Sequence, residues 1–508
     1  MTLGEMFSRR AAETPDGLAI VDGARRLTWA EWDKEVRRLA GGLRCAGLRP
    51  GDPVVTVLSN RMECATLYWA CQFLGLIFTP YTWRASAADI AFVVDDSEAR
   101  ALVFEDRSAA AVSEHNGNPP PVLVSLDDES YSTLLHSTPV GEPTRCGSET
   151  TALMLYTSGT TGRPKGVPRS HAAEHAATLS CIAALDYETG ISQLGVMPLF
   201  HTMGMRAALM SCVLGGPYIC LPAFDAAAAL RLIEDERIDA LFLVPTLFHN
   251  LVNHPEIAAA DVTSITNIAY AGMAMTTELT QRCQATFAPA RFSNFYGSSE
   301  IFTFAHCDHV TEKPGCAGRA GAGQEIRVVR ADPEPTATAG DTVPAGTPGE
   351  IIASMACPDA FAGYWKRPDA DAKAIRDGWY YTGDLGYFDA DGELFVIGRT
   401  DDMIISGGEN IYPEEVEAVL TKSPLVRHAA VIGEAHGRWG EQVVAFIEAA
   451  APAAAGAPAA DDAARSQALD AHCLASDLAR FKRPRRYEFV DTLPRSASGK
   501  LLRRQLRS

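Results

Sequence analysis

The sequence predicts a mixed α/β fold, with a large N-terminal domain of packed α/β subdomains and a small α+β C-terminal domain. Three observations predict it. The chain has 508 residues, more than one hydrophobic core usually serves. Apolar helical segments alternate with short β-rich runs through the first 400 residues, a pattern typical of mixed or parallel sheets. The pattern of the sequence then changes near residues 399–402, which predicts one domain at residues 1–400 and a second at residues 401–508.

The first helix with a clear signature begins after Thr28. This residue lies three positions before Glu31, so the two fit a capping box. The apolar positions that follow recur at helical spacing on one face: Trp32, Val36, Leu39, Ala40 and Leu43. Gly47 lies near the end of the helix, and residues 54–58 form an apolar run typical of a buried strand.

Later elements follow the same alternation. They are a strand at 218–221, a helix at 226–236, a strand at 240–244, a helix at 413–420, and strands at 429–432 and 443–447. Pro413 suits the first turn of its helix, where the missing N–H has no partner to lose. Residues 449–462 are rich in Ala, Pro and Gly, which predicts a surface loop.

Composition excludes several classes of protein. The formal net charge of -18 disfavours nucleic acid and anionic lipid as partners. The twelve cysteines include no C-x-x-C pair, so neither a disulfide framework nor a zinc site is indicated. The longest apolar stretch, 207–224, is interrupted by Gly-Gly-Pro, and the N-terminus has no run of signal-peptide length. We therefore expect a cytoplasmic protein without stable membrane association.

The segment YTSGTTGRPKGV, residues 156–167, follows an apolar run and predicts a binding site for a polyphosphate. Glycines let backbone approach a ligand closely, hydroxyls donate hydrogen bonds, and a lysine adds positive charge. The candidate residues are Thr157, Ser158, Gly159, Thr160, Thr161, Gly162 and Lys165. The Walker spacing G-x-x-x-x-G-K-[ST] cannot be fitted here. For the loop alone, a flexible turn between strands is the other reading.

This string resembles the phosphate loop of the adenylate-forming superfamily, which includes acyl- and aryl-CoA synthetases, luciferases and peptide-synthetase adenylation domains. Five further segments match that family in the same order, so the resemblance covers nearly the whole chain. It implies an ATP-dependent carboxylate–CoA ligase, an acid–thiol ligase that forms acyl-AMP and pyrophosphate and then acyl-CoA and AMP. The substrates and cofactors implied are ATP, CoA, Mg²⁺ and a small carboxylic acid.

The resemblance also assigns the remaining ATP contacts. The segment NFYGSSE is similar to the family's adenine loop, and DGWYYTGD and GRTDD carry the ribose contacts. The residues implied are Asn294, Tyr296, Gly297, Ser298, Glu300, Asp384 and Arg399. Glu300 is also the implied ligand of Mg²⁺, a hard cation suited to one carboxylate plus phosphate oxygens. Ser299 replaces the commoner threonine and keeps the hydroxyl.

The acyl pocket is implied by PLFHTMG, AGMAM and the adenine loop. Its residues would be His201, Thr202, Met203, Gly272, Met273, Phe295, Gly297, Phe302 and Thr303. His201 would lie where the pocket meets the CoA channel and counts as catalytic together with Lys500. Most of these side chains are apolar or small, which favours an aromatic, benzoate-like acid or a short branched one. No buried cation is evident, so we expect diacids to be disfavoured, while medium-chain fatty acids remain open.

The C-terminal segments resemble those of bacterial aryl-CoA ligases of the 4-chlorobenzoate–CoA ligase type. Lys500 in PRSASGKLLRR matches the catalytic lysine, and Asp401 the hinge about which the small domain swings between the two steps. The implied CoA contacts are Arg84, Gly407, Gly408, Trp439, Phe481 and Arg483. Aromatic faces suit adenine and arginine suits phosphate. Thr82-Trp83 replaces the family's usual Asn-Pro before Arg84.

The sequence allows three alternatives to a CoA ligase. An adenylating enzyme that loads a carrier protein predicts loss of Trp439, Phe481 and Arg483, which are present. A luciferase-like oxygenase shares every motif but not the aryl-CoA similarity. A non-catalytic homologue predicts a damaged site, whereas Lys165, Glu300, Asp384, Arg399 and Lys500 are intact. The sequence fixes no oligomeric state, and a homodimer is compatible with it.

Overall fold

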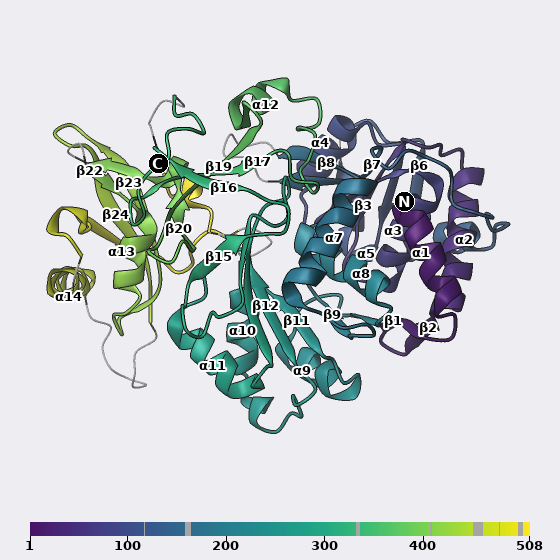
Figure 1. Ribbon diagram of the computed structural model, residues 1–508, viewed down its shortest axis with the longest axis horizontal. Helices are drawn as coiled ribbons and strands as arrows, with labels where there is room; N and C mark the ends of the chain where they lie inside the picture. The colour runs from purple at the N-terminus through teal and green to yellow at the C-terminus, as the bar shows by residue number, and fades with distance from the viewer. Residues whose placement is uncertain are drawn as a thin grey trace. The chain divides into compact units, whose positions relative to one another are not determined.

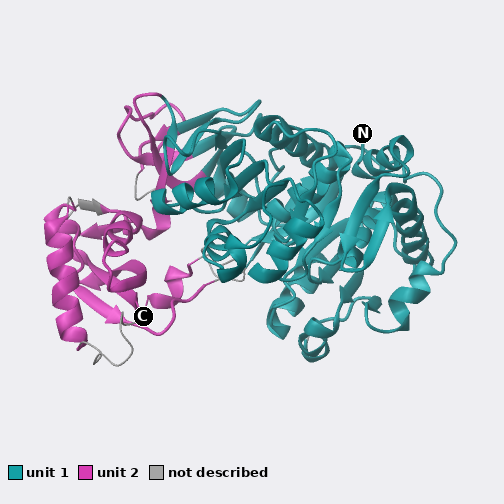
Figure 2. Cartoon of the chain, turned by 90° about the horizontal axis from the view of Figure 1, so that it is seen from below, with its two compact units in different colours: residues 1–327, 352–381, 392–394 teal, residues 328–351, 382–391, 395–508 magenta. Residues whose placement is uncertain are grey.

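The computed structural model describes residues 1–115, 117–157, 164–331, 336–406, 409–450, 461–476, 478–495 and 501–507. The chain forms two compact units, shown in Figure 2. Unit 1 comprises residues 1–327, 352–381 and 392–394, and unit 2 comprises residues 328–351, 382–391 and 395–508. The predicted mixed α/β class, with a large N-terminal and a small C-terminal part, is confirmed. The domain boundary at residue 400 stays a prediction.

One sheet of unit 1 has six strands in the order β6-β5-β3-β4-β7-β8. The strands are β3 Pro53–Val57, β4 Ile77–Tyr81, β5 Ala101–Phe104, β6 Val122–Ser125, β7 Thr151–Thr157 and β8 Lys165–Ser170. The first four in this order are parallel neighbours, whereas β7 and β8 are antiparallel. The two ends of the predicted phosphate segment are paired there, since Thr157 lies opposite Lys165.

Helices pack around this sheet, and Figure 1 shows α1, α2 and α3 beside it. The helices are α1 Leu3–Glu13, α2 Trp29–Cys45, α3 Met62–Leu74, α4 Ala87–Ser97, α5 Asp106–Glu114 and α6 Glu129–Leu135. The predicted capping box is confirmed, because Glu31 N donates to Thr28 Oγ1 and Thr28 N donates to Glu31 Oε2. The predicted apolar face of α2 is buried, against a core that includes Phe7, Trp69 and Phe73.

Nine strands of unit 1 form part of a second sheet, in the order β15-β14-β13-β12-β11-β9-β10-β1-β2. They are β1 Leu18–Asp22, β2 Arg25–Thr28, β9 Gln193–Gly195, β10 Tyr218–Cys220, β11 Ala240–Leu243, β12 Asn267–Ala271, β13 Arg291–Tyr296, β14 Ala305–Cys307 and β15 Cys316–Ala320. Their helices are α7 His171–Leu185, α8 Thr202–Leu214, α9 Ala226–Asp235, α10 Pro245–Val252 and α11 Thr277–Phe287. Neighbours from β1 to β13 are parallel, so the ends of β12 and β13 open onto one edge. The predicted strand–helix–strand at 218–244 is confirmed.

In unit 2, a five-stranded sheet carries two helices. The strands are β21 Ile404–Ser406, β22 Glu409–Ile411, β23 Val426–His436, β24 Gly440–Ala449 and β25 Arg486–Phe489, with α13 Pro413–Leu420 and α14 Asp462–Ala475. The helix at 413–420 is confirmed, while the two central strands extend well beyond 429–432 and 443–447. Short 3₁₀ turns lie at Thr400–Asp402, Arg480–Lys482 and Arg503–Leu506. Among all described residues, no helix has the length and apolar character needed to cross a bilayer.

Candidate active site

The described ends of the phosphate segment lie beside helix α4 and beside Tyr364, both in unit 1. Lys165 begins β8, and its Nζ lies 3.9 Å from the centre of the Tyr364 ring. Tyr156, at the end of β7, donates a hydrogen bond of 2.7 Å from its hydroxyl to Asp96 Oδ2. Ser158, Gly159, Thr160, Thr161 and Gly162 lie outside the described residues. The structure therefore places Thr157 and Lys165 and leaves the rest of this assignment a prediction.

The adenine-loop motif forms the end of β13 and the turn after it. Gly297 is required there, because a Cβ would come 1.6 Å from the Phe302 carbonyl oxygen. Ser298 Oγ accepts hydrogen bonds from the backbone N–H groups of Glu300 and Ile301, which turns the chain back on itself. The side-chain amide of Asn294 donates to Cys316 O at 2.7 Å, so it fastens β15. This turn places Glu300 just after the end of β13.

Glu300 is buried and firmly held. The Tyr364 hydroxyl donates to its Oε1 at 2.7 Å. Its carbonyl oxygen accepts hydrogen bonds from Phe361 N at 2.9 Å and from an Arg169 guanidinium N–H at 2.7 Å. That guanidinium also donates to Asp359 O at 2.6 Å. The carboxylate predicted to bind a cation is therefore fixed at both its backbone and its side chain.

Arg169 belongs to a buried ion network that the sequence did not reveal. Its Nε lies 2.8 Å from Glu174 Oε1, and an Arg206 guanidinium nitrogen lies 3.0 Å from Glu174 Oε2. All three side chains are at most 1% exposed. The Arg206 guanidinium also lies 4.6 Å from the centre of the Phe302 ring. The expectation that no buried cation adjoins the acyl residues is wrong, although Glu174 balances one of the two charges.

The predicted acyl residues lie at three places in unit 1. Phe295 contacts Phe302, with ring centres 6.5 Å apart. Gly272 follows β12 with φ +87, a conformation that glycine adopts without strain. Met273 is 47% exposed. Thr202 and Met203 begin α8, whereas the Thr303 hydroxyl is buried and has no hydrogen-bond partner in the described structure. Phe295 and Phe302 are therefore in contact, and the assignment of an acyl pocket stays a prediction.

His201 is the residue before the first turn of α8 and contacts the adjacent Phe200 ring at 4.6 Å. Its Nε2 is buried without a hydrogen-bond partner among the described residues. Burial lowers the pKa of His201 to about 4. The imidazole is therefore neutral near pH 7, so it can accept or donate one hydrogen bond but carries no charge for a bound anion.

The two predicted ribose contacts meet in unit 2. An Arg399 guanidinium nitrogen lies 2.5 Å from Asp384 Oδ1. Asp384 lies within β19 (Trp379–Phe388), where its N–H donates to Thr382 Oγ1 after Gly383 at φ +70, and Arg399 ends β20 (Leu394–Arg399). A carboxylate beside a guanidinium offers acceptors and donors together, which suits a diol.

On unit 1, the predicted CoA contact Arg84 lies over an indole ring. Its guanidinium carbon is 4.0 Å from the centre of the Trp83 ring, and that of Arg107 is 5.4 Å from the same centre. Both arginines are exposed. The substitution of Trp83 for the usual proline thus adds a platform for two cations, and Arg107 is a candidate anion contact that the sequence did not indicate.

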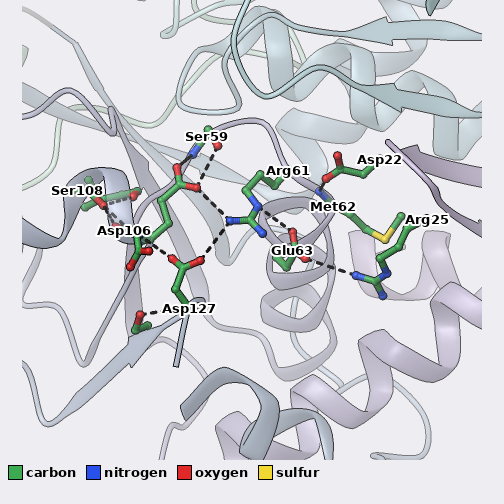
Figure 3. Close-up of polar contacts among 12 residues, drawn as sticks. Asp22, Arg25, Ser59, Arg61, Met62, Glu63, Asp106, Ser108 and Asp127 are labelled. Atoms are coloured by element: carbon green, nitrogen blue, oxygen red, sulfur yellow. Dashed lines mark hydrogen bonds and ion pairs between the residues drawn. The ribbon is translucent and has the colours of Figure 1, made fainter. Parts of the chain in front are cut away.

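A cluster of polar contacts lies at the carboxyl ends of β3, β5 and β6, around the start of α5 (Figure 3). Asp106 N donates to Asp127 Oδ2 at 2.7 Å, which fastens the start of α5. The buried Glu105 carboxylate accepts hydrogen bonds from Ser59 N at 2.7 Å and from Arg61 at 3.3 Å. These bonds fix the helix turn that carries Arg107.

The described CoA contacts predicted in unit 2 are two aromatic residues and one arginine, Trp439, Phe481 and Arg483. Trp439 stacks on His436 at 4.5 Å, and the Arg485 guanidinium lies 5.3 Å from its ring. Phe481 is 41% exposed. Arg483 lies 3.0 Å from Asp470 on α14, so its charge is already paired. Gly407 and Gly408 lie outside the described residues.

Lys500 also lies outside the described residues, but the chain around it is held. Leu501 pairs with Arg495, and Leu502 N donates to Pro494 O at 2.8 Å. Arg503 then binds three carboxylates of unit 2. Its guanidinium nitrogens lie 2.8 Å from Glu417, 2.9 Å from Glu414 and 3.2 Å from Asp402. Asp401, in the adjacent 3₁₀ turn, accepts at its carbonyl from Arg507.

Comparison with known proteins identifies the class of protein. Residues 7–365 match the AMP-binding enzyme family, and residues 415–500 match the AMP-binding enzyme C-terminal domain. The chain therefore belongs to the AMP-binding enzyme family, and the predicted membership of the adenylate-forming enzymes is confirmed.

Several relatives are named as CoA synthases or CoA ligases, and one is named as a carrier-protein ligase. The chain is 35% identical over 517 residues to a feruloyl-CoA synthase of an Amycolatopsis species, across 99% of this chain and 98% of the relative. It is 34% identical to the fatty acid–[acyl-carrier-protein] ligase ScoC of Streptomyces coeruleorubidus, across 100% and 96%. It is 31% identical to an Arthrobacter 4-chlorobenzoate–CoA ligase, across 100% and 95%. The structure of o-succinylbenzoate CoA synthetase from Bacillus subtilis with its acyl-adenylate superposes with a TM-score of 0.85, at 28% identity across 99% and 98%.

Proposed function

We propose that the protein is an ATP-dependent carboxylate–CoA ligase, which forms acyl-AMP and pyrophosphate and then acyl-CoA and AMP. Similarity to CoA ligases along the whole chain supports the reaction type. The observation that carries the proposal is the state of the site, since its charged residues are present and held. Lys165 and Glu300 both contact Tyr364, and Asp384 pairs with Arg399.

In the first step, a carboxylate oxygen of the acid attacks the α-phosphorus of ATP. The new P–O bond forms as the bond to the β-phosphate oxygen breaks and pyrophosphate leaves. Lys165 and the hydroxyl-rich residues 157–162 would hold the leaving phosphates, and Lys500 would neutralise charge at the α-phosphate. Positioning and fixed charges supply most of the rate in such transfers.

The residues present fit a magnesium ion. Glu300 is a buried carboxylate with only Oε1 engaged by a described residue. The described residues include no group of three potential metal ligands. Mg²⁺ is commonly held by one or two carboxylates plus phosphate oxygens, so one carboxylate beside the phosphate segment suffices. Bound there, Mg²⁺ would neutralise phosphate charge.

In the second step, the CoA thiol attacks the acyl carbon and AMP leaves. Arg84, Trp439 and Phe481 would meet the CoA nucleotide, with Gly407 and Gly408 beside the pantetheine arm. The surroundings of Trp439 support this role, because a half-buried ring flanked by Arg438 and Arg485 suits a nucleotide that carries phosphates. Movement of residues 401–508 about Asp401, which would exchange Lys500 for the thiol channel, is part of the same proposal.

The acid is proposed to be aromatic or short and branched. Phe295 lies between the rings of Phe242 and Phe302, at 5.6 and 6.5 Å, which supports a flat apolar substrate. The feruloyl and chlorobenzoyl substrates of two relatives are aromatic. Diacids stay disfavoured for a new reason, because the buried Arg206 is engaged by Glu174 and Thr178.

A carrier-protein ligase is the second candidate, and the ScoC relative favours it. The two candidates differ in the thiol. Free CoA needs groups for its nucleotide, which Trp439 and its cations supply, whereas a carrier protein brings its own folded surface. Free ATP and CoA as co-substrates imply a cytoplasmic enzyme. A homodimer remains a proposal, which light scattering on the purified protein tests.

The decisive experiment measures pyrophosphate release with ATP and Mg²⁺ across benzoate-like, short branched and medium-chain acids, with and without CoA. Turnover that requires CoA, with acyl-CoA detected by mass spectrometry, is the expected result and identifies the acid. Release of about one equivalent that CoA does not change would contradict the proposal and favour a carrier-protein partner.

A further inference from the structure

Tyr364 joins two side chains that the proposed function assigns separately. It lies in the turn before α12 (Pro368–Ala374) and is buried. Its hydroxyl donates to Glu300 Oε1 at 2.7 Å. Its ring receives the Lys165 ammonium at 3.9 Å from the ring centre. A single side chain therefore contacts both the implied cation ligand and the phosphate-segment lysine, through different chemical groups.

The hydroxyl acts on the direction of the Glu300 carboxylate. The hydrogen bond engages Oε1, so Oε2 is the carboxylate oxygen that no side chain in the described part of the chain engages. Hydrogen bonds to a metal-binding carboxylate fix its orientation, and their loss usually weakens metal binding. In this contact the Tyr364 hydroxyl is the donor, because an ionised carboxylate only accepts hydrogen bonds.

The ring acts on the position of Lys165. The face of an aromatic ring carries negative electrostatic potential and attracts an ammonium group. Contact at 3.9 Å holds the lysine head over the ring. Neighbouring groups in turn hold Tyr364. Its backbone N–H donates to Asp371 Oδ1 at 2.7 Å, and its hydroxyl lies 3.3 Å from that of Tyr380.

We propose that Tyr364 is a positioning residue whose hydroxyl and ring have separate roles. This inference rests on the proposed function. The hydroxyl orients Glu300 toward a divalent cation on the nucleotide phosphates, and the ring places the Lys165 ammonium beside the same phosphates. The Tyr364 side chain thus positions the negative Glu300 and the positive Lys165 at the same polyphosphate. The hydroxyl of Tyr380, 3.3 Å away, helps to hold the Tyr364 hydroxyl in place.

The test separates the hydroxyl from the ring with Tyr364→Phe and Tyr364→Leu. Mn²⁺ serves as the divalent probe, and its binding with ATP is measured by electron paramagnetic resonance. Nucleotide binding without metal is measured by calorimetry with ATP and EDTA. We expect Tyr364→Phe to weaken Mn²⁺ binding about 10- to 100-fold and to leave metal-free ATP binding unchanged. Tyr364→Leu is expected to weaken both, because it also removes the surface that holds Lys165.

Tyr218→Phe is the matched control, since its hydroxyl is equally buried in unit 1 and has no hydrogen-bond partner among the described residues. It should change neither measurement. If Tyr364→Phe binds Mn²⁺ as tightly as the wild type, the role of the hydroxyl is wrong. If Tyr364→Leu keeps wild-type metal-free binding, the role of the ring is wrong. A wild-type protein that fails to bind ATP both in the presence of Mn²⁺ and in the presence of EDTA would instead overturn the proposed function itself.

Discussion

The buried pair of arginines around Glu174 allows a quantitative prediction. In Glu174→Gln the side chain keeps its shape and loses its charge. Arg169 and Arg206 would then share a buried site with no carboxylate between them. Arg169 Nη2 and Arg206 Nε already lack hydrogen-bond partners in the described structure, so no neighbour stands ready to replace the lost bonds. The substitution should therefore destabilise unit 1.

The magnitude follows from burial and geometry. Glu174 makes one charged hydrogen bond to each arginine, at 2.8 and 3.0 Å, and both partners are at most 1% exposed. Removing one member of a buried ion pair typically costs about 3–5 kcal/mol, mostly because the partner stays buried and uncompensated. Since the single carboxylate balances two arginines, we expect Glu174→Gln to reduce the free energy of unfolding by about 3–5 kcal/mol.

Tryptophan fluorescence can follow this loss during denaturant unfolding. Six of the seven tryptophans lie in unit 1, so the signal reports mainly on that unit. Glu13→Gln breaks the exposed pair with Arg9 and should leave the unfolding midpoint unchanged. A loss below about 1 kcal/mol for Glu174→Gln would refute the reasoning, because it would mean that water or rearrangement compensates the arginines.

The same carboxylate should make the stability of unit 1 depend on pH. Burial alone would raise the pKa of Glu174, but Arg206 and Arg169 outweigh it and hold the pKa below its ordinary value. A group with a lowered folded-state pKa stabilises the protein above its unfolded-state pKa and loses this contribution as the pH falls through the folded value. Stability of the wild type should therefore fall in acid more steeply than that of Glu174→Gln, as measured by denaturant titrations between pH 3 and pH 7.

Three further outcomes are expected. Lys500→Ala should abolish acyl-AMP formation, measured as pyrophosphate release, and spare thioester formation from supplied acyl-AMP; loss of neither half-reaction would contradict its role. Arg503→Met should open unit 2 to hydrogen exchange, because three carboxylates lose their shared cation, whereas the exposed neighbour Arg504→Met should not. Burial raises the pKa of Glu414 to about 7, so its deprotonation destabilises unit 2 as the pH rises to that value. Glu414→Gln should flatten this decline in thermal melts from pH 5 to pH 8.

Much of the fold was predictable because the local signals were strong. The helix after Thr28 carries both a capping box and a continuous apolar face, and both signals act within one helix. The strands of unit 2 were predicted too short. Residues 426–436 and 440–449 pair along their whole length, including polar positions such as Glu434 opposite Gln442. Hydrophobic runs mark only the buried centre of such a hairpin, while backbone pairing extends beyond it.

Family motifs indicated the candidate residues of the site, whereas charged residues that are paired in the interior could not be found in this way. Glu174 and Arg206 look like ordinary surface charges when considered one at a time. The informative signal was the helix around each, because α7 and α8 are otherwise almost entirely apolar or small. A charged residue in a helix that is buried on most faces needs a partner. Glu174 and Arg206 lie 32 positions apart in the sequence. Only the packing of α7 against α8 shows that they form an ion pair with each other.

Arg503 shows why motifs far apart in the sequence belong together. Glu414 and Glu417 lie in α13, about 90 positions before Arg503, and nothing in the sequence indicates that these residues form ion pairs. In the structure Glu414 and Glu417 bind Arg503, which also reaches Asp402 beside the proposed hinge residue. One cation thus fastens the chain that follows Lys500 to both the helix and the 3₁₀ turn of unit 2. A lysine that acts at one defined atom needs such an anchor, since a long side chain on an unfastened tail cannot hold a charge in place.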